Sequence, residues 1–286
     1  MRRSGTTSAP VGLHRHDHVC WIHQGGRSWT EPMIRFFREG AVAGQRLLYV
    51  ADKAETELAD DLAPLSSRDA MLGSGQLKLL PLAKLYGSVD DFTADEQIAM
   101  FKELTATAVR AGFGCLRVAA EATSLFVGVD AEHAARRFVG YEVGIDRVMA
   151  TEPMLSMCGY DRRLVSAAAA SALCLVHPLR HGARIGSACG VFAEEDGSWS
   201  VTGEIDLVSR DSFETALSVL SELPGDRDIT LRLEGLTFID VAGVRALAEL
   251  SARLAPRRLI LHDPPTPLRR ILRLWWQDLP GLEVAD

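Results

Sequence analysis

The sequence has few lysines and no long apolar segment. Only four of its 286 residues are lysines, and none of them follows a glycine, so the chain lacks the Gly-Lys-Ser/Thr ending of a phosphate-binding P-loop. No apolar run approaches the roughly 18 residues that a membrane-spanning helix needs, and we expect no membrane association. The five cysteines are scattered and odd in number, which indicates reduced, buried thiols in a cytoplasmic protein rather than a disulfide framework.

Acidic side chains are concentrated towards the C-terminus. The chain has a formal charge of −7. Residues 186–286 contain 17 acidic and 10 basic side chains and account for the whole excess, because residues 1–185 contain 21 of each. We therefore expect a protein surface, and not nucleic acid, as the direct partner of the C-terminal part. The length suits two domains or one large one.

A strand that leads into a helix organises the C-terminal part. Apolar and polar residues alternate over residues 228–233, which is typical of a strand. Leu236, Phe238 and Ile239 are expected to return the chain to the core. From Val244 the apolar residues are spaced three and four apart, which predicts a helix that Asp240 is placed to cap. Residues 241–243 then lie at its exposed tip, where free N–H groups suit an anion or a partner's carboxylate.

Three motifs of this part point to a family. They are Gly203-Glu204-Ile205-Asp206, Gly235-Leu236-Thr237-Phe238-Ile239-Asp240 and, from Asp263, Asp-Pro-Pro-Thr-Pro-Leu-Arg-Arg-Ile. In this order they resemble the STAS domain, the fold of bacterial anti-sigma-factor antagonists, over about the last hundred residues. The resemblance implies an α/β domain that binds an anti-sigma factor of the histidine-kinase-like type. The expected partner-binding residues are Asp206, Asp240, Val241, Ala242 and Gly243.

The helix tip departs from the phosphorylated members of that family. Those members have a sequence similar to Asp-Ser-Ser-Gly at this point, and the partner kinase modifies the serine before the glycine. This chain has Asp240-Val241-Ala242-Gly243 instead. Ala242 has no hydroxyl and cannot take the roughly two negative charges of a phosphate. The nearest hydroxyl, that of Thr237, is expected in the strand-to-helix connection. The domain is then controlled from elsewhere, or it is kept only as an interaction or dimerisation scaffold.

Strands and helices alternate through the first part of the chain. Short strands are expected near residues 18–22, 45–50, 75–80, 115–120 and 154–158. Helices are expected between them, the most regular at residues 95–111. This alternation predicts an α/β fold with a mostly parallel sheet and helices on both of its faces.

The composition divides the chain into four parts. The first ten residues contain two arginines but no apolar stretch, which predicts a disordered leader and not a signal peptide. Proline and glycine interrupt the helical periodicity over residues 177–186, which indicates a boundary. We expect a leader at residues 1–13, an α/β domain at 14–180, a linker at 181–190 and the STAS-like domain at 191–286.

Four loose motifs of the first domain, taken together, also resemble a family. They are His18-Val19-Cys20, the segment 40–52, Leu116-Arg117-Val118-Ala119-Ala120-Glu121 and Met157-Cys158-Gly159-Tyr160-Asp161-Arg162-Arg163. They are similar to the MEDS sensory domain of methanogen and methylotroph regulators, a family that resembles RecA-type folds without their phosphate loop. The resemblance implies that the domain detects a small ligand or a cellular state.

Polar side chains follow several of the predicted strands. The carboxyl ends of parallel strands share one edge of a sheet, where ligands usually bind. The candidate ligand-binding residues at this edge are His23, Asp52, Glu121, Tyr160 and Asp161. The alternative is that the acids cap the helices that follow them, and Glu121 is the residue farthest from its next predicted helix.

The segment His14-Arg15-His16-Asp17-His18 raises the question of a metal. Alternate histidines on a strand point the same way, and imidazoles bind Zn²⁺, Ni²⁺ or Cu²⁺. His14 and His16 belong with the polar leader, however, and we expect His18 to fix a strand end by hydrogen bonding. His18 and Cys20 are kept as tentative ligand-binding residues because they lie in the family motif. We predict no metal site and no catalytic triad.

Together the two resemblances imply a non-enzymatic signalling regulator. The STAS-like domain would bind an anti-sigma factor, and the MEDS-like domain would control it through an unidentified small ligand or nucleotide. The alternative is a nucleotide-binding ATPase-like module or enzyme with the STAS-like domain as a tether, although the loop at residues 23–28 lacks the P-loop spacing. A purely structural scaffold and an oligomer stay open.

Overall fold

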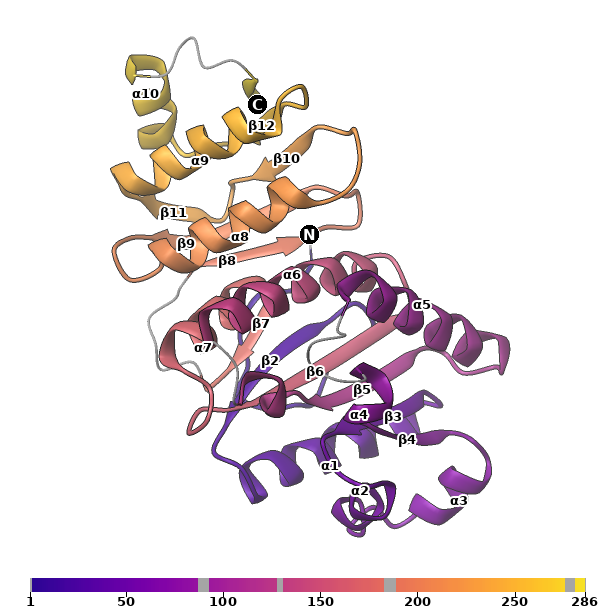
Figure 1. Cartoon of the computed structure of the whole chain (residues 1–286). Coiled ribbons are helices and arrows are strands. Elements are labelled where there is room, and N and C mark those ends of the chain that lie inside the picture. Colours follow the sequence, from indigo (N-terminus) through magenta and orange to yellow (C-terminus); the bar gives the residue numbers. More distant parts are fainter. Residues whose placement is uncertain (1, 87–92, 128–130, 183–188, 276–280, 286) are drawn as a thin grey trace.

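The structure is a computed structural model, and it describes residues 2–86, 93–127, 131–182, 189–275 and 281–285. It contains two α/β domains, each built on its own sheet (Figure 1). Among the described residues, no helix combines the length and the apolar character that crossing a membrane would require.

The first domain is built on a seven-stranded sheet in which every pairing is parallel. The strand order is β1-β7-β2-β6-β5-β3-β4. The strands are β1 (Gly5–Thr6), β2 (His18–His23), β3 (Arg46–Ala51), β4 (Leu77–Pro81), β5 (Leu116–Glu121), β6 (Met154–Asp161) and β7 (Leu179–His181). The predicted fold class is therefore confirmed for this domain.

Helices cover both faces of this sheet. They are α1 (Arg27–Val42), α2 (Glu55–Asp61), α3 (Arg68–Gly73), α4 (Leu82–Tyr86), α5 (Ala94–Arg110), α6 (Ala131–Met149) and α7 (Ala167–Val176), with a 3₁₀ turn at Thr123–Phe126. Alternate residues of a strand point to opposite faces, so Leu47 and Tyr49 pack against α1 and α2, whereas Leu48 and Val50 pack on the side of α5, α6 and α7.

The second domain has a six-stranded mixed sheet. Five parallel strands have the order β11-β9-β10-β12-β13, and β8 pairs with β9 in the antiparallel direction. The strands are β8 (Gly190–Ala193), β9 (Trp199–Ile205), β10 (Ile229–Arg232), β11 (Leu236–Ile239), β12 (Leu259–His262) and β13 (Leu282–Ala285). The helices are α8 (Arg210–Glu222), α9 (Val241–Leu254) and α10 (Thr266–Trp275).

The two domains share an apolar interface. Helices α6 and α7 of the first domain pack against α8 and β8 of the second. Val139, Val143 and Leu175 belong to the same buried cluster as Phe213 and Leu217 of α8, so one core continues from domain to domain. Of the predicted linker, residues 183–188 lie outside the described part of the chain.

The expectation of a disordered leader is wrong. Strand β1 pairs with β7 at the edge of the first sheet, Leu13 is 3 % exposed, and the side chain of Arg2 is buried against Asp146 of α6. A short polar segment can be ordered without an apolar stretch when its backbone completes a sheet edge and its charge has a buried partner.

Candidate ligand pocket and docking surface

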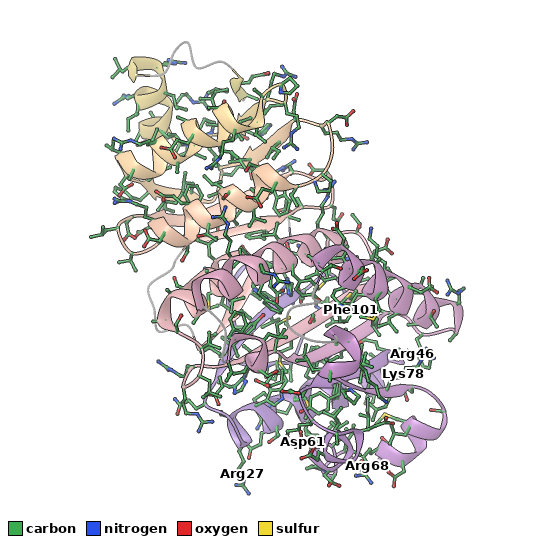
Figure 2. The ribbon with its side chains drawn as sticks, in the orientation of Figure 1. Arg27, Arg46, Asp61, Arg68, Lys78 and Phe101 are labelled. Carbon is green, nitrogen blue, oxygen red and sulfur yellow. The ribbon has the colours of Figure 1, made fainter. Side chains whose placement is uncertain are left out.

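A pocket of about 470 Å³ lies where the parallel strands of the first sheet end. His23 ends β2, Glu121 ends β5, Asp161 ends β6 and Asp52 follows β3, and all four line this pocket. The remaining wall contains Gly25, Gly26, Arg27, Trp29, Thr30, Tyr49, Ala51, Lys53, Asp61, Thr123 and Leu164. Figure 2 labels Arg27, whose side chain extends outward, and Asp61. The structure thus brings together four of the residues selected at the strand ends.

A hydrogen-bond network orients Glu121 in this pocket. The Nδ1 atom of His23 accepts a hydrogen bond of 2.9 Å from the backbone N–H of Gly25, so the ring proton is on Nε2, which lies 3.3 Å from Oε1 of Glu121. The hydroxyl of Thr123 donates to the same carboxylate and accepts the backbone N–H of Asp161 at 2.8 Å. The carboxylate therefore accepts a hydrogen bond from Thr123 and lies within ion-pair distance of His23.

Helix capping does not explain the acids of the pocket. The N-cap residue of α2 is Ala54, whose N–H is bound by Glu57, and α7 is capped by the hydroxyl of Ser166. Neither Asp52 nor Asp161 has this role. Asp161 instead accepts from the Nε atom of Arg163 at 2.9 Å, and this bond, the largest influence, holds the pKa of Asp161 below its usual 3.8.

The loop after β2 differs from a phosphate-binding loop in its hydrogen bonds. The N–H of Gln24 donates to Ser28 Oγ at 2.8 Å and that of Gly25 donates to His23, whereas a P-loop directs such groups at a phosphate. The space above Gly25 is also filled, because a Cβ there would lie 2.1 Å from Nη2 of Arg163. This loop therefore offers a poor cradle for a nucleotide phosphate.

Three of the predicted ligand residues lie elsewhere. His18, Cys20 and Tyr160 are buried beneath α6 and α7 and do not line the pocket. The expectation that Tyr160 joins the crevice is wrong because strand residues alternate between the faces of a sheet: Tyr160 points away from the face of Asp161. The Tyr160 hydroxyl donates to Glu142 at 2.5 Å.

His18 has the hydrogen-bonding role expected of it, but deep in the core. Its Nδ1 atom lies 3.0 Å from Oδ1 of Asp146. Burial is the largest influence on Asp146 and would raise its pKa, but Arg2 and His18 outweigh it and hold the value at about 2. Glu142, Asp146 and His177 were not predicted as site residues. The available signal was a pair of acids four positions apart in helix α6, which otherwise buries apolar residues.

The tip of helix α9 has the geometry expected from the sequence. Asp240 caps the helix, because its Oδ1 atom accepts the N–H of Gly243 at 2.8 Å, and its Oδ2 atom lies 2.7 Å from Nη2 of Arg210, the first residue of α8. Burial is the largest influence on this carboxyl and would raise its pKa, but the Gly243 N–H and Arg210 outweigh it and lower the pKa below 3.8.

The residues at this tip differ in accessibility. Val241 is 64 % exposed and Ala242 half-buried. Gly243 is buried, and a Cβ there would lie 2.7 Å from Cγ2 of Ile205. Asp206 is half-buried, and its Oδ1 atom accepts the N–H groups of Val208 and Ser209. Asp206 therefore shapes the turn into α8.

Exposed apolar side chains surround the tip. Because the N–H of Asp240 donates to the carbonyl of Ile205 at 2.9 Å, the ends of β9 and β11 lie side by side. The exposed apolar residues at these ends are Leu207, Val208, Phe238 and Val241. We call them, together with Asp206, Asp240 and Ala242, the docking surface. The expectation that Phe238 returns to the core is wrong, and Thr237 lies on β11, where its hydroxyl donates to Gly203.

Two family profiles match the chain. The family described as MEDS, the MEthanogen/methylotroph, DcmR Sensory domain, matches residues 17–178. A second family, described as Mlab, STAS domain, matches residues 192–276. The chain therefore belongs to the MEDS family, and its C-terminal part is a STAS domain. Both resemblances seen in the motifs are confirmed.

Solved structures were also compared with the chain. One is the anti-sigma factor antagonist SpoIIAA in its unphosphorylated form, with 19 % identity over 35 % of this chain and 88 % of that chain and a TM-score of 0.29. Another is the Bacillus cell fate determinant SpoIIAA in the phosphorylated form, with 20 % identity over 35 % and 92 % and a TM-score of 0.29. These values are too low to add to the fold assignment. No curated protein sequence matches the chain.

Proposed function

We propose that this chain is a non-enzymatic signalling regulator whose STAS domain binds an anti-sigma factor of the histidine-kinase-like type, under control of a ligand that binds the MEDS domain. The observation that supports it best is the docking surface, where a capped helix start lacking a modifiable hydroxyl is surrounded by exposed apolar side chains. Grouped apolar residues on a surface are typical of protein–protein contacts.

The chemistry of the docking surface favours a partner with an apolar patch. Leu207 and Val241 supply apolar area, and the Asp240–Arg210 ion pair supplies a polar edge that fixes orientation. Gly243 contributes only by allowing α9 to approach β9 and β11 closely. The acidic balance of residues 186–286 disfavours nucleic acid at this surface.

Control by a ligand takes the place of control by phosphate. Ala242 cannot be phosphorylated, so a phosphate cannot switch the docking surface between a binding and a non-binding state. Such a switch would have to come from the MEDS domain. Helix α8 packs against α6 and α7 and begins at Arg210, which holds Asp240. A ligand that binds one arrangement of the MEDS domain better would shift the population of both domains through this helix. The pocket lined by His23 and Glu121 is the proposed ligand site.

Binding measurements with the cognate partner test the docking surface. The partner is the histidine-kinase-like anti-sigma factor of the same organism, and its affinity is measured by calorimetry. Val241→Asp places a charge in the contact, and we expect at least a tenfold loss of affinity. Leu274→Asp is the matched control, because Leu274 is an exposed apolar residue of the same domain, on α10. Equal effects of the two variants, or no binding by the unmodified chain, would overturn the proposal.

Phosphorylation by the same partner tests the role of Ala242. After incubation with the kinase and ATP, we expect no phosphate on residues 235–245 of the natural chain and phosphate on the Ala242→Ser variant. A phosphate on this segment of the natural chain would contradict control by ligand alone. Mass spectrometry of the peptide distinguishes the two results.

The second candidate is an ATPase-like module. The observation that favours it is Glu121, a carboxylate that accepts a hydrogen bond from Thr123 and lies 3.3 Å from His23 in a pocket at the sheet edge. ATP hydrolysis above background that disappears in Glu121→Gln would support this function. The internally bonded loop after β2 weighs against it.

A further inference from the structure

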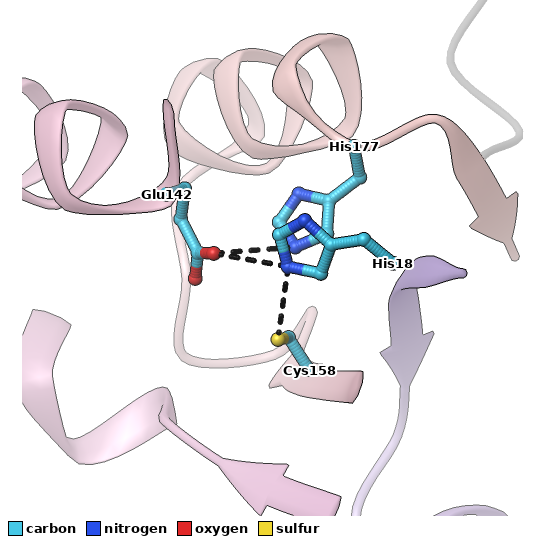
Figure 3. A group of neighbouring side chains, drawn as sticks. All are labelled: His18, Glu142, Cys158 and His177. Carbon is cyan, nitrogen blue, oxygen red and sulfur yellow. Dashed lines mark hydrogen bonds and ion pairs between the residues drawn. The ribbon is translucent and has the colours of Figure 1, made fainter. Parts of the chain in front are cut away.

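Four ligand-type side chains converge in the interior of the MEDS domain (Figure 3). His18 comes from β2, Cys158 from β6, Glu142 from α6 and His177 from the end of α7. Nε2 of His18 lies 3.2 Å from Oε2 of Glu142 and 3.5 Å from Sγ of Cys158. Nε2 of His177 lies 3.5 Å from the same Glu142 oxygen. All four ligand atoms lie within 4.8 Å of one another.

The outer nitrogen of each histidine is already used. Nδ1 of His18 lies 3.0 Å from Oδ1 of Asp146, and Nδ1 of His177 lies 2.7 Å from the carbonyl oxygen of Leu173. Both partners are acceptors, so in the neutral rings each Nδ1 carries the proton. Both Nε2 lone pairs then face Glu142 at the centre of the cluster.

Two acceptor atoms at the centre of the cluster are left without a hydrogen bond within the described part of the chain. Oε2 of Glu142 and Nε2 of His177 have no hydrogen-bond partner among the described residues, although these side chains are 1 % and 0 % exposed. The Tyr160 hydroxyl binds the other Glu142 oxygen. Buried acceptors that face one another without a donor are unfavourable, and a cation bound between them would remove this cost.

We propose that His18, Glu142, Cys158 and His177 form a transition-metal site whose best-matched ion is Zn²⁺. Two imidazoles, a thiolate and a carboxylate are the ligands that Zn²⁺ takes in tetrahedral sites. With metal–ligand distances of about 2.0–2.3 Å, the ligand atoms of a tetrahedron are about 3.3–3.8 Å apart, close to the separations of 3.2 and 3.5 Å found here. Asp146 and the Leu173 carbonyl are the outer partners that orient metal-bound histidines.

Asp146 connects the site to the junction of the domains. Asp146, the outer partner of His18, also accepts the backbone N–H of Ala193 in β8 at 2.8 Å and binds Arg2 at 2.9 Å. A metal on His18 would therefore act on the carboxylate that holds the first strand of the STAS domain. This inference does not depend on the identity of the partner protein.

Metal titration and a cobalt spectrum test the site in the intact chain of residues 1–286. After removal of metal with a chelator, we expect titration with Zn²⁺ against a chromophoric competitor to give one tight site per chain. Titration with Co²⁺ should give the visible bands of tetrahedral cobalt and a near-ultraviolet thiolate-to-cobalt band. The spectrum needs no variant, so it stands even where a substitution disturbs folding.

Substitutions assign the ligands. Cys158→Ser should remove the thiolate-to-cobalt band, and His177→Gln should weaken Zn²⁺ binding by at least about tenfold. Cys115→Ser is the control, because Cys115 is another buried thiol, on the opposite face of the sheet, and it should leave both unchanged. A folded natural chain that binds neither ion, or a thiolate-to-cobalt band that persists in Cys158→Ser, would overturn the proposal. The positive charge in the cluster would then be a proton on His18 and not a metal ion.

Discussion

The carboxylate of Asp146 lies 2.8 Å from the backbone nitrogen of Ala193 and joins the two domains at a buried point. The same side chain binds Arg2 at 2.9 Å and His18 at 3.0 Å. One acid of helix α6 thus connects the leader, the interior cluster of the MEDS domain and the first strand of the STAS domain.

Replacement of Asp146 should destabilise the whole chain. Asp146→Ala leaves the buried guanidinium of Arg2 with carbonyl partners but without its carboxylate, and breaking a buried ion pair in this way costs about 3–5 kcal/mol. Urea unfolding at pH 7 measures the loss. Glu222→Ala is the control, because its pair with Arg136 also joins the domains but both side chains are more than half exposed, so the loss should be about 0–1 kcal/mol. Equal losses would contradict a special role of Asp146.

Removal of the leader should lower stability as well. Deletion of residues 2–7 removes β1 from the sheet edge and Arg2 from Asp146. The buried Asp146 carboxylate keeps His18 and the Ala193 N–H but loses its guanidinium partner, so we expect a loss of similar size, roughly 3–5 kcal/mol. A thermal unfolding temperature equal to that of the intact chain would show that these residues do not support the fold.

Gly243 should tolerate no side chain, for reasons of packing. A Cβ at this position would lie 2.7 Å from Ile205 and 2.8 Å from Ile239, and such overpacking costs about 1–3 kcal/mol. The matched control is Gly140→Ala in helix α6, where a Cβ meets nothing within 4 Å and where alanine should be neutral or stabilising by about 0.5–1 kcal/mol. Chemical denaturation of the two variants checks the contrast, which a loss in both would contradict.

The sequence predicts the architecture because each element has its own periodicity. Leu47 to Val50 are buried on alternate faces of one strand, and the helix of the STAS domain begins at the expected cap, Asp240. The carboxyl ends of parallel strands meet at one edge of a sheet, so the sequence also predicts that His23, Asp52, Glu121 and Asp161 share one pocket. These are local or topological properties that a single sequence contains.

The remaining features depend on packing between distant segments. His177 follows the alanine-rich helix α7, and Glu142 lies in helix α6. No motif in the sequence links either residue to His18. Their proximity results from the packing of α6 and α7 over β2 and β6. The ordered leader is also a tertiary effect, because its short strand needs β7, about 170 residues away in the sequence, as its partner.

The contribution of Asp240 should depend on pH. Its pKa in the folded chain is below the usual 3.8, so its ionised form stabilises the fold fully above the unfolded value, and this contribution is lost as the pH falls through the folded value. Asp240→Asn keeps a capping oxygen but loses the charge that binds Arg210. We expect it to cost about 0.5–1 kcal/mol at pH 7, and the difference from the natural chain should shrink as the pH falls below 3.8. Urea unfolding at pH 7, 5 and 3 measures this trend, with Glu249→Gln, an exposed acid of the same helix, as the control that should stay near zero throughout. A difference at Asp240 that is constant over this range, or that grows in acid, would mean that the carboxylate charge does not stabilise the helix tip.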